Sequence, residues 1–384
     1  TNYHGPSYFF ILALSFAILK ISEFSLRFPT ALFGILICLL PLFFRKPKNK
    51  YLASLLLILS PSLMYYSRYS IHESLFVLST LVSLYTFSQI IETNSLKPLP
   101  LLAASLAIAF TTKETISISI LSLLILTIIN HKEIKKIKIK NQENTILLSI
   151  IIFLIIYIIL FTSFFTNPLG LLDSIKGYFP WLNRGFVEPG HAKPFYYYLQ
   201  LLIKYELLLF ILAIMAIPKA FKTKNLFAKN RSRWVLANLI IYSLINYKTP
   251  WLIINITAPM ALLAAFFLTS IKNKKTKIAI IVITIIYLAI ISVNLNFINT
   301  WQNNSFAYVH TNPDILNLVN EINENYKPSS RILILSNEYW PLPFYLDGKN
   351  VMYLDKTETF NPEEYEEYDI FIVKDSLIKE QDLS

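Results

Sequence analysis

Four short polar stretches lie between long apolar runs, and each carries side chains that can do chemistry. The first reads SRYSIHES over residues 67–74 and holds Arg68, His72 and Glu73. A carboxylate and an imidazole can accept a proton or ligate a divalent cation. They do not form a zincin site, because the second histidine of that motif would stand at position 76, which is Phe. The spacing equally allows a plain helix start, with Ser70 as N-cap and Glu73 closing a capping box.

Two further stretches each place a lysine between apolar runs. TTKET (111–115) holds Lys113 beside Glu114, and NYKTPW (246–251) holds Lys248. An ammonium in such a place can contact a lipid-linked phosphate as a point charge. The alternative is ordinary: a tight polar turn in the first case, and an interfacial Pro-Trp turn in the second.

The fourth stretch, WLNRGFVEPGHAKPFYYYLQLLIKYE over residues 181–206, mixes charges with aromatic rings. Side chains such as Trp181 and Tyr197 suit the faces of sugars, and they also form aromatic belts at membrane interfaces. Lys204 can snorkel towards such an interface. Glu206 is harder to explain in this way, because a carboxylate about three turns into an apolar run is a functional hypothesis by default.

The elements that must position these residues are membrane helices. The chain has 384 residues, of which 54% are hydrophobic and 15% charged, and its mean hydropathy is +0.50. A soluble domain is usually about 25% charged. Solid apolar blocks favour helices that cross a bilayer over the alternating strands of a β-barrel. The single cysteine, Cys38, excludes a disulfide within the chain and a cysteine-based metal site.

We predict about ten spans and one shorter apolar stretch, 6–19, which lies in the interface or re-enters. The chain begins at Thr1 and not at Met, so we expect its N-terminus to be truncated. The predicted spans are 29–44, 51–66, 73–91, 98–111, 115–130, 145–165, 195–217, 234–247, 251–271 and 278–297.

The charge of the loops alternates along the chain, which predicts the topology. One set of loops holds 20 Lys and Arg residues, and the intervening set holds eight. Because cytoplasmic loops carry the excess of Lys and Arg, the first set faces the cytoplasm and both ends of the chain lie outside. The net charge of +11 is therefore topological, and nucleic acid is not an expected partner. The cationic loops are 45–50, 92–97, 131–140, 218–233 and 272–277.

The composition changes near residue 298, where a polar and mixed-charge region begins. Residues 313–326 have helical spacing, whereas 331–336, 351–354 and 369–374 read as short buried strands. Strands that alternate with helical segments predict a small soluble α/β domain with a parallel sheet over 298–384, placed outside the membrane. NPEEYEEY, between the last two strands, reads as a helix or turn.

The four polar stretches predict one site at the outer membrane face. Each places a cation, an acid or a histidine at a span end, and ionisable residues there default to function. Such a site suits the meeting of a lipid-linked anionic donor with a polar acceptor. It suits an ion pathway less well, because the chain has only seven glycines and no paired halves with broken spans.

The order of these features resembles the membrane glycosyltransferases of the GT-C superfamily. The stretches that carry the resemblance lie within residues 4–260, and they are HGPSYFFILALSFAILKISEFSLRFPTALFG, LSPSLMYYSRYSIHES, TTKET, KPFYYYLQLLIKYE and YKTPWLIINITAP. They are most similar to the dolichyl-phosphate-mannose–protein mannosyltransferase-like branch, and within it to the archaeal flippase-activity-associated family of N-glycosylation.

The resemblance implies an α-helical polytopic fold and a set of site residues. Residues 1–28 would be the remainder of the first outer loop with a juxtamembrane helix, and 29–297 the transmembrane bundle. His4, within His-Gly-Pro, and Glu73 match family positions, and the family's acidic pair, with the main base, would lie upstream of Thr1. The implied catalytic residues are Glu73, His4 and His72. The implied donor-phosphate residues are Arg68, Lys113 and Lys248, and those for the acceptor or sugar are Tyr197, Glu206 and Trp181.

The implied function is transfer of a sugar, with inversion, from a polyprenyl-phosphate-linked donor to a glycan or protein acceptor on the extracytoplasmic face. A divalent cation, Mg²⁺ or Mn²⁺, would bind at Glu73 if a metal takes part. The expected location is a prokaryotic plasma membrane. The alternative is a non-catalytic protein that binds lipid-linked sugars or is associated with a flippase.

Overall fold

The chain forms two compact units, Thr1–Tyr308 and Val309–Ser384. The structure is a computed structural model, which describes residues 4–44, 49–137, 141–186, 191–308, 311–355 and 365–374.

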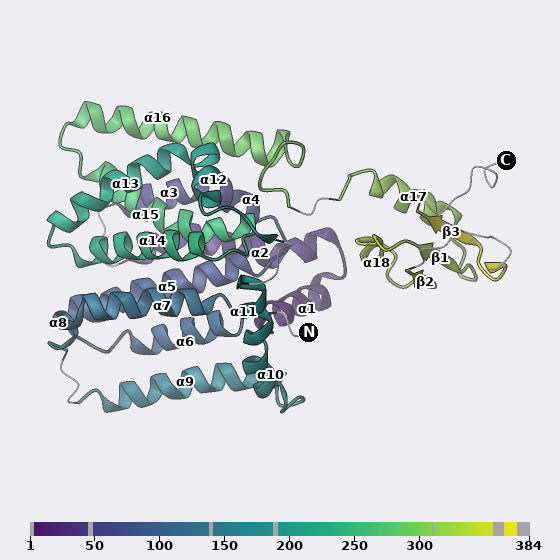
Figure 1. The fold of residues 1–384 in the computed structure, drawn as a ribbon, viewed down its shortest axis with the longest axis horizontal. Helices are drawn as coiled ribbons and strands as arrows, with labels where there is room; N and C mark the ends of the chain where they lie inside the picture. Colours follow the sequence, from purple (N-terminus) through teal and green to yellow (C-terminus); the bar gives the residue numbers. More distant parts are fainter. Residues whose placement is uncertain are drawn as a thin grey trace. The chain divides into compact units, whose positions relative to one another are not determined.

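The first unit is built of helices, most of them apolar (Figure 1). A helix satisfies its own backbone hydrogen bonds, which a segment inside a bilayer must do. The helices are α1 (Ser7–Leu19), α2 (Glu23–Leu39), η1 (Leu40–Phe43), α3 (Lys50–Leu59), α4 (Pro61–Tyr66), α5 (Glu73–Thr93), α6 (Leu99–Phe110), α7 (Ile116–Ile129), α8 (His131–Ile134), α9 (Glu143–Phe161), α10 (Gly170–Lys176), α11 (Tyr178–Phe186), α12 (Tyr197–Tyr205), α13 (Leu207–Lys222), α14 (Leu226–Leu244), η3 (Pro250–Ile253), α15 (Ile254–Thr269), α16 (Lys274–Val293) and the π-helix η4 (Asn294–Ile298).

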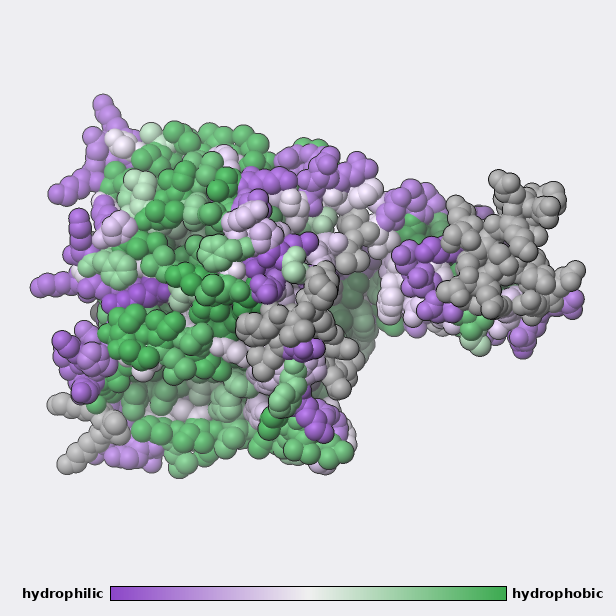
Figure 2. Space-filling model, viewed as in Figure 1, coloured by the Kyte–Doolittle hydropathy of each residue, from purple (hydrophilic) through white to green (hydrophobic). Residues whose placement is uncertain are grey.

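Within the described residues, five helices are long and apolar enough to cross a membrane, or up to six if a bent pair counts as one span. The five are Glu23–Phe43, Glu73–Thr93, Glu143–Phe161, Pro250–Thr269 and Lys274–Ile298. On the face of this unit that Figure 2 shows, apolar residues form a broad belt with hydrophilic residues at its two ends. Such a belt is what a bilayer requires of the protein surface.

Two predicted spans are divided into two helices each. The expected span 51–66 breaks between α3 and α4, because Ser60 precedes a proline and is held in an extended conformation. The expected span 195–217 breaks at Glu206, where α12 and α13 meet at a bend of 111°. The two breaks lie against each other, since Ser60 Oγ donates to Glu206 Oε1 at 2.7 Å.

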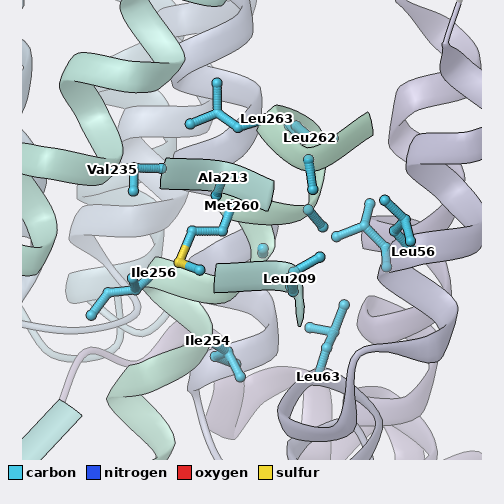
Figure 3. Packing of buried hydrophobic residues seen from close by; sticks show 14 of the residues in the cluster. Leu56, Leu63, Leu209, Ala213, Val235, Ile254, Ile256, Met260, Leu262 and Leu263 are labelled. Carbon is cyan, nitrogen blue, oxygen red and sulfur yellow. The ribbon is translucent and has the colours of Figure 1, made fainter. Parts of the chain in front are cut away.

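The core of the first unit forms around α15. In the span Pro250–Thr269, which includes α15, 83% of an apolar 18-residue stretch is buried. The corresponding share is 6% for α9 and 22% for the span that includes α16. Small residues at Ala258, Ala261, Ala264 and Ala265 let α13 and α14 approach it closely. Figure 3 shows Met260 and Leu263 of α15 packed with Leu209 and Ala213 of α13, Val235 of α14 and Leu56 of α3.

The second unit is a small α/β unit with a parallel sheet, as predicted. Its elements are α17 (Ile315–Asn325), β1 (Ile332–Leu335), α18 (Leu342–Tyr345), β2 (Val351–Leu354) and β3 (Ile370–Val373). The strand order is β2-β1-β3, and Ile332 of β1 aligns with Val351 and Ile370. β1 is buried on both faces, with α17 on one of them. The first half of NPEEYEEY, 361–364, lies outside the described residues, and its second half turns so that Tyr368 donates its backbone N–H to the Tyr365 carbonyl at 3.0 Å.

Candidate functional site

The start of α1 is attached directly to the turn between α6 and α7. Ser7 donates its backbone N–H to the Thr111 carbonyl at 2.9 Å, and its hydroxyl to Thr111 Oγ1 at 2.6 Å. Gly5 leaves no gap, because a Cβ there would lie 2.2 Å from the Thr111 oxygen. The His-Gly-Pro and TTKET stretches, about 100 positions apart in the sequence, are therefore one structure. Figure 1 shows α1, α10 and α11 at the same end of the helix bundle.

Lys113 and Glu73 form a buried ion pair at this end. Lys113 Nζ donates to Glu73 Oε1 at 2.7 Å and to Oε2 at 2.9 Å. The Glu73 side chain is 1% exposed and that of Lys113 10%. Glu73 is the first residue of α5, where the helix dipole also favours a negative charge. The pair therefore fixes the Lys113 ammonium at the start of a membrane helix.

His4 is held by Glu114, the neighbour of Lys113 in the sequence. His4 Nδ1 lies 3.1 Å from Glu114 Oε2, with the imidazole about one-third exposed and the carboxylate nearly buried. Behind His4 lies His72, whose ring is 4.7 Å from that of His4 and 4.8 Å from that of Tyr8, between ring centroids. Burial, with His4 and Lys113 nearby, lowers the pKa of His72 to about 2, so its imidazole stays neutral.

The alternative interpretation of residues 67–74, a helix start with Ser70 as N-cap and a capping box closed by Glu73, is wrong. Helix α5 begins at Glu73, its N-cap residue is His72, and no side chain caps it. Ser70 instead donates to the Leu26 carbonyl, and its hydroxyl meets that of Tyr8 at 2.9 Å. Because Ser70 is used to join α1 and α2 to the loop, it is not available to α5.

A cavity beside Lys113 brings several predicted residues together. It has an empty volume of about 700 Å³, open solvent at its mouth included, and we name it the Lys113 cavity. Predicted residues His4, Lys113 and Trp181 line it. Thr115, Tyr242 and Thr249 also line it, and the side-chain hydroxyl of each is buried with no hydrogen-bond partner in the structure. Buried hydroxyls are nearly always paired, so three in one cavity wall indicate a polar occupant.

Lys248 supports this cavity from behind and does not line it. Its neighbours Tyr247 and Thr249 are in the wall, but its own ammonium donates to the carbonyls of Lys193 and Ile245. Burial lowers the pKa of Lys248. Tyr198 of α12 braces the same turn by donating to the Thr249 carbonyl at 3.1 Å. Lys248 is therefore close to the cavity with its charge turned to backbone oxygens.

Three predicted residues, Arg68, Tyr197 and Glu206, are not among those that line the cavity. Arg68 donates to the Asn296 carbonyl at 2.7 Å and lies over the Phe297 ring, so it is tied to η4. Tyr197 packs on the hydrophobic core beside Tyr198.

Glu206 is fully buried at the meeting of the two helix breaks. Its Oε1 accepts hydrogen bonds from Ser60 Oγ and from the backbone N–H and the hydroxyl of Ser62, at 2.6–3.0 Å. Its Oε2 has no partner in the structure. The carboxylate that the sequence marked as unusual therefore joins four helix ends, those of α3, α4, α12 and α13.

The side chains around Glu73 do not fit a divalent cation. In the part of the chain that the structure describes, no group of three His, Cys, Asp or Glu side chains could hold a metal. Both oxygens of Glu73 already accept hydrogen bonds from Lys113. Binding of Mg²⁺ or Mn²⁺ stays a prediction.

Sequence reasoning missed the hydroxyls of the cavity wall and did not place Glu114 among the site residues. Tyr242 stands in the apolar stretch LIIYSLI, where a phenol reads as one more core ring. The one indication in the sequence was the phenol hydroxyl of Tyr242, which needs a hydrogen-bond partner when it is buried. Glu114 adjoins a predicted site lysine, but only the fold brings His4 to it.

Comparisons with known proteins support the fold of the chain. Residues 3–161 match the model of a family described as dolichyl-phosphate-mannose-protein mannosyltransferase. No curated protein matches the chain in sequence. Among solved structures, the chain is similar to ArnT from Cupriavidus metallidurans bound to undecaprenyl phosphate, with a TM-score of 0.66 and 13% identity over 93% of this chain and 76% of that one. The apo state of the same protein gives a TM-score of 0.67 and 13% identity, with 92% and 76% covered.

A second solved relative comes from an archaeon. The oligosaccharyltransferase AglB from Archaeoglobus fulgidus, in complex with an inhibitory peptide and a dolichol-phosphate, has a TM-score of 0.56 and 12% identity, covering 90% of this chain and 55% of that one. Together with the apolar spans, these matches make the chain an integral membrane protein. The chain has the GT-C fold, and its residues 3–161 are similar to the dolichyl-phosphate-mannose-protein mannosyltransferase family.

Proposed function

We propose that this protein is a glycosyltransferase that moves a sugar from a polyprenyl-phosphate-linked donor to an acceptor hydroxyl on the extracytoplasmic face of the membrane. The family match and the GT-C fold support the class of enzyme and the class of donor. Solved relatives carry undecaprenyl phosphate or a dolichol-phosphate, which supports a polyprenyl carrier here. The loop charges support the extracytoplasmic face, since the site loops belong to the set with few cations.

The observation that carries the proposal is the Lys113 cavity. It combines one ammonium with three buried, unpartnered hydroxyls and the rings of Trp181 and Trp251. A sugar phosphate needs a cation for its phosphate, hydrogen-bonding groups for its hydroxyls and a flat apolar surface for its ring. Each of these is present in one cavity wall.

Glu73 acts in this proposal by holding Lys113. Both carboxylate oxygens accept hydrogen bonds from the ammonium, and the pair is buried, so Glu73 holds the Lys113 side chain in place. When the donor phosphate arrives, Lys113 keeps this counterion on one side and meets the phosphate on the other. The cation is in position before the reaction and stabilises the charge that develops on the leaving phosphate.

The side chains that line the cavity support inversion at the anomeric carbon. A double displacement needs a side-chain nucleophile close to the anomeric carbon, which in most glycosidases is a carboxylate. No carboxylate is among the described residues that line the Lys113 cavity. We therefore expect a single displacement: the acceptor oxygen bonds to the anomeric carbon as the bond from that carbon to the phosphate oxygen breaks, and the phosphate leaves with the electron pair.

The test is transfer by the protein in lipid nanodiscs, with radiolabelled polyprenyl-phosphate mannose as donor and a mixture of glycan and peptide acceptors. We expect Lys113→Met to weaken donor binding and abolish transfer, while the exposed, matched control Lys20→Met changes neither. Donor binding without transfer to any acceptor would favour the alternative, a protein that binds or helps to flip lipid-linked sugars. Equal donor binding by Lys113→Met and the native chain would refute the phosphate role.

A further inference from the structure

Arg233 of α14 is held by two buried amides, far from the end of the bundle where α1 and α11 lie. Its Nη1 donates to Asn130 Oδ1 at 2.9 Å and to Asn230 Oδ1 at 3.1 Å. Asn130 follows the last residue of α7 and precedes α8, which Figure 1 shows at the opposite end of the bundle from α1 and α11. Both asparagines are buried, at 1% and 0% exposed. One nitrogen of the guanidinium is therefore fixed in place.

The two asparagines are themselves held by neighbouring helices. Asn130 Nδ2 donates to Asn230 Oδ1 at 3.0 Å and to the Leu126 carbonyl at 2.7 Å. Asn230 Nδ2 donates to Ser88 Oγ of α5 at 3.3 Å. This network joins α5, α7 and α14, and Arg233 is its charged member. A guanidinium held in this way is preorganised, because little side-chain freedom is left to lose when an anion binds.

The other edge of the Arg233 guanidinium is open to an anion. Both hydrogen bonds to the asparagines come from Nη1. In the part of the chain that the structure describes, no acceptor bonds to Nε or Nη2. Those two nitrogens form the planar fork that binds a carboxylate or a phosphate through parallel hydrogen bonds. The asparagines thus hold the back of the group and leave its anion-binding edge available.

Among the described residues, no carboxylate occupies this fork. Segment 218–233 holds six Lys and Arg residues and no Asp or Glu. Glu133 of α8 interacts with the charge of Arg233 at longer range, but no ion pair joins the two side chains. Two other cations of the segment, Lys219 and Arg231, donate to backbone carbonyls instead. Arg233 therefore presents a fixed cation without a carboxylate partner in the described chain.

The surroundings of Arg233 favour a phospholipid over a soluble anion. The guanidinium carbon lies 5.8 Å from the centre of the Phe221 ring, and that ring is 42% exposed. Ile128 and Ile129, in the last turn of α7, are exposed apolar side chains as well. The acyl chains of a lipid can cover such surface while its phosphate meets the fork. The loop charges predict the cytoplasmic leaflet at this end, and that leaflet carries anionic lipids.

We propose that Arg233, positioned by Asn130 and Asn230, binds the phosphate of an anionic phospholipid in the cytoplasmic leaflet. The phosphate oxygens accept hydrogen bonds from Nε and Nη2, and an acyl chain lies against Phe221. A zwitterionic lipid offers the same phosphate but brings its own cation, which Arg233 repels, so the site favours a headgroup with net negative charge. The site is separate from the Lys113 cavity and does not depend on the proposed transferase function.

The first test measures lipid binding to the purified protein by native mass spectrometry in detergent micelles. The probes are phosphatidylglycerol and phosphatidylcholine with the same acyl chains. We expect the native protein to bind phosphatidylglycerol about tenfold more tightly, and Arg233→Met to lose this preference. The matched control Lys222→Met, an exposed cation of the same segment, should keep it. Equal binding of the two lipids by the native protein, an unchanged preference in Arg233→Met, or an equal loss in Lys222→Met overturns the proposal.

The second test separates a lipid site from a contact that only joins helices. Asn230→Asp gives Arg233 an internal carboxylate and still accepts hydrogen bonds from Arg233, Asn130 and the Ser88 hydroxyl, so the network stays joined. We expect this variant to lose the preference for phosphatidylglycerol while its melting temperature without lipid does not fall.

Added phosphatidylglycerol should raise the melting temperature of the native protein and not that of Asn230→Asp, since a ligand of the folded state stabilises it by mass action. An equal rise in both proteins overturns the role of Arg233. Inorganic phosphate at the same concentration should give no rise. A rise equal to that with the lipid would assign the fork to a soluble phosphate and overturn the lipid site.

Discussion

The Lys113–Glu73 pair gives the sharpest prediction for stability. Replacing Glu73 by Gln keeps the side chain's volume and removes the charge that faces the Lys113 ammonium. The carboxylate is 1% exposed and the lysine side chain 10%, so neither group has water to replace its partner. Breaking a buried pair from one side costs about 3–5 kcal/mol, because it leaves an uncompensated charge. This corresponds to a change of about 10²- to 10⁴-fold in the folding equilibrium constant.

The double variant distinguishes this reasoning from a simple loss of packing. Glu73→Gln with Lys113→Met leaves no buried charge, and an uncharged replacement of a buried pair is often neutral or stabilising. We therefore expect the double variant to be more stable than either single one, with an interaction free energy of about 3 kcal/mol. It should nevertheless bind no donor, because the cation is gone.

The measurement is reversible unfolding in mixed micelles, titrated with a denaturing detergent and observed by tryptophan fluorescence. The matched control is Glu23→Gln in the exposed pair with Arg27, where the two side chains are 45% and 53% exposed and the atoms 3.5 Å apart. Such a surface pair contributes about 0.3–0.5 kcal/mol. If Glu73→Gln loses no more stability than Glu23→Gln, or if the losses of the two single variants add in the double one, the account of the buried pair is refuted.

Three further predictions follow from the surroundings of the site. The pKa of His72 is lowered from 6.5 to about 2, so the folded state binds fewer protons than the unfolded state, and the stability that His72 contributes is full above pH 6.5 and falls as the pH drops below it. His72→Gln should therefore flatten the fall in melting temperature between pH 7 and pH 4.5, whereas the control His131→Gln, at an exposed histidine, should not. Gly5→Ala should lower transfer by about 10²-fold and also lower the melting temperature, because its methyl group would meet the Thr111 backbone and displace His4. Unchanged transfer would contradict the close fit. Glu206→Ala should destabilise the fold more than Glu206→Gln, because it leaves the three hydrogen-bond donors of Ser60 and Ser62 unpaired, at a cost of about 1–3 kcal/mol each. Equal losses of stability in detergent unfolding would show that these donors find other partners.

The sequence was sufficient for the class of fold and for the main candidates of the site. Apolar blocks marked the membrane helices, and short runs such as RILILS marked the strands of the parallel sheet, because burial on both faces leaves little room for polar residues. Lys113 stood out as a cation between apolar runs, and the structure places it in a cavity wall with His4 and Trp181. A charged residue between apolar runs can be recognised from the sequence alone.

The ion-pair partners of the charged residues and the bends in the helices could not be predicted in the same way. Glu73 and Lys113 are 40 positions apart, and only packing decides that one neutralises the other. The break at Ser60 had a signal in Pro61, but the bend at Glu206 had none, because no proline or glycine stands nearby and the surrounding residues suit a continuous helix. The hydroxyl of Tyr242 had no signal beyond its own polarity, since periodicity places rings and not their hydrogen-bond partners.

The bend at Glu206 has a consequence for how the protein meets membranes of different thickness. A straight helix responds to a thicker or thinner bilayer by tilting along its whole length. Here α13 packs on α15, whereas α12 contacts η3 and supports Thr249 in the wall of the Lys113 cavity. Because the Glu206 carboxylate ties the end of α12 to Ser60 and Ser62, α13 can adjust its angle without turning α12. We expect the shape of the cavity to be insulated from the thickness of the host bilayer.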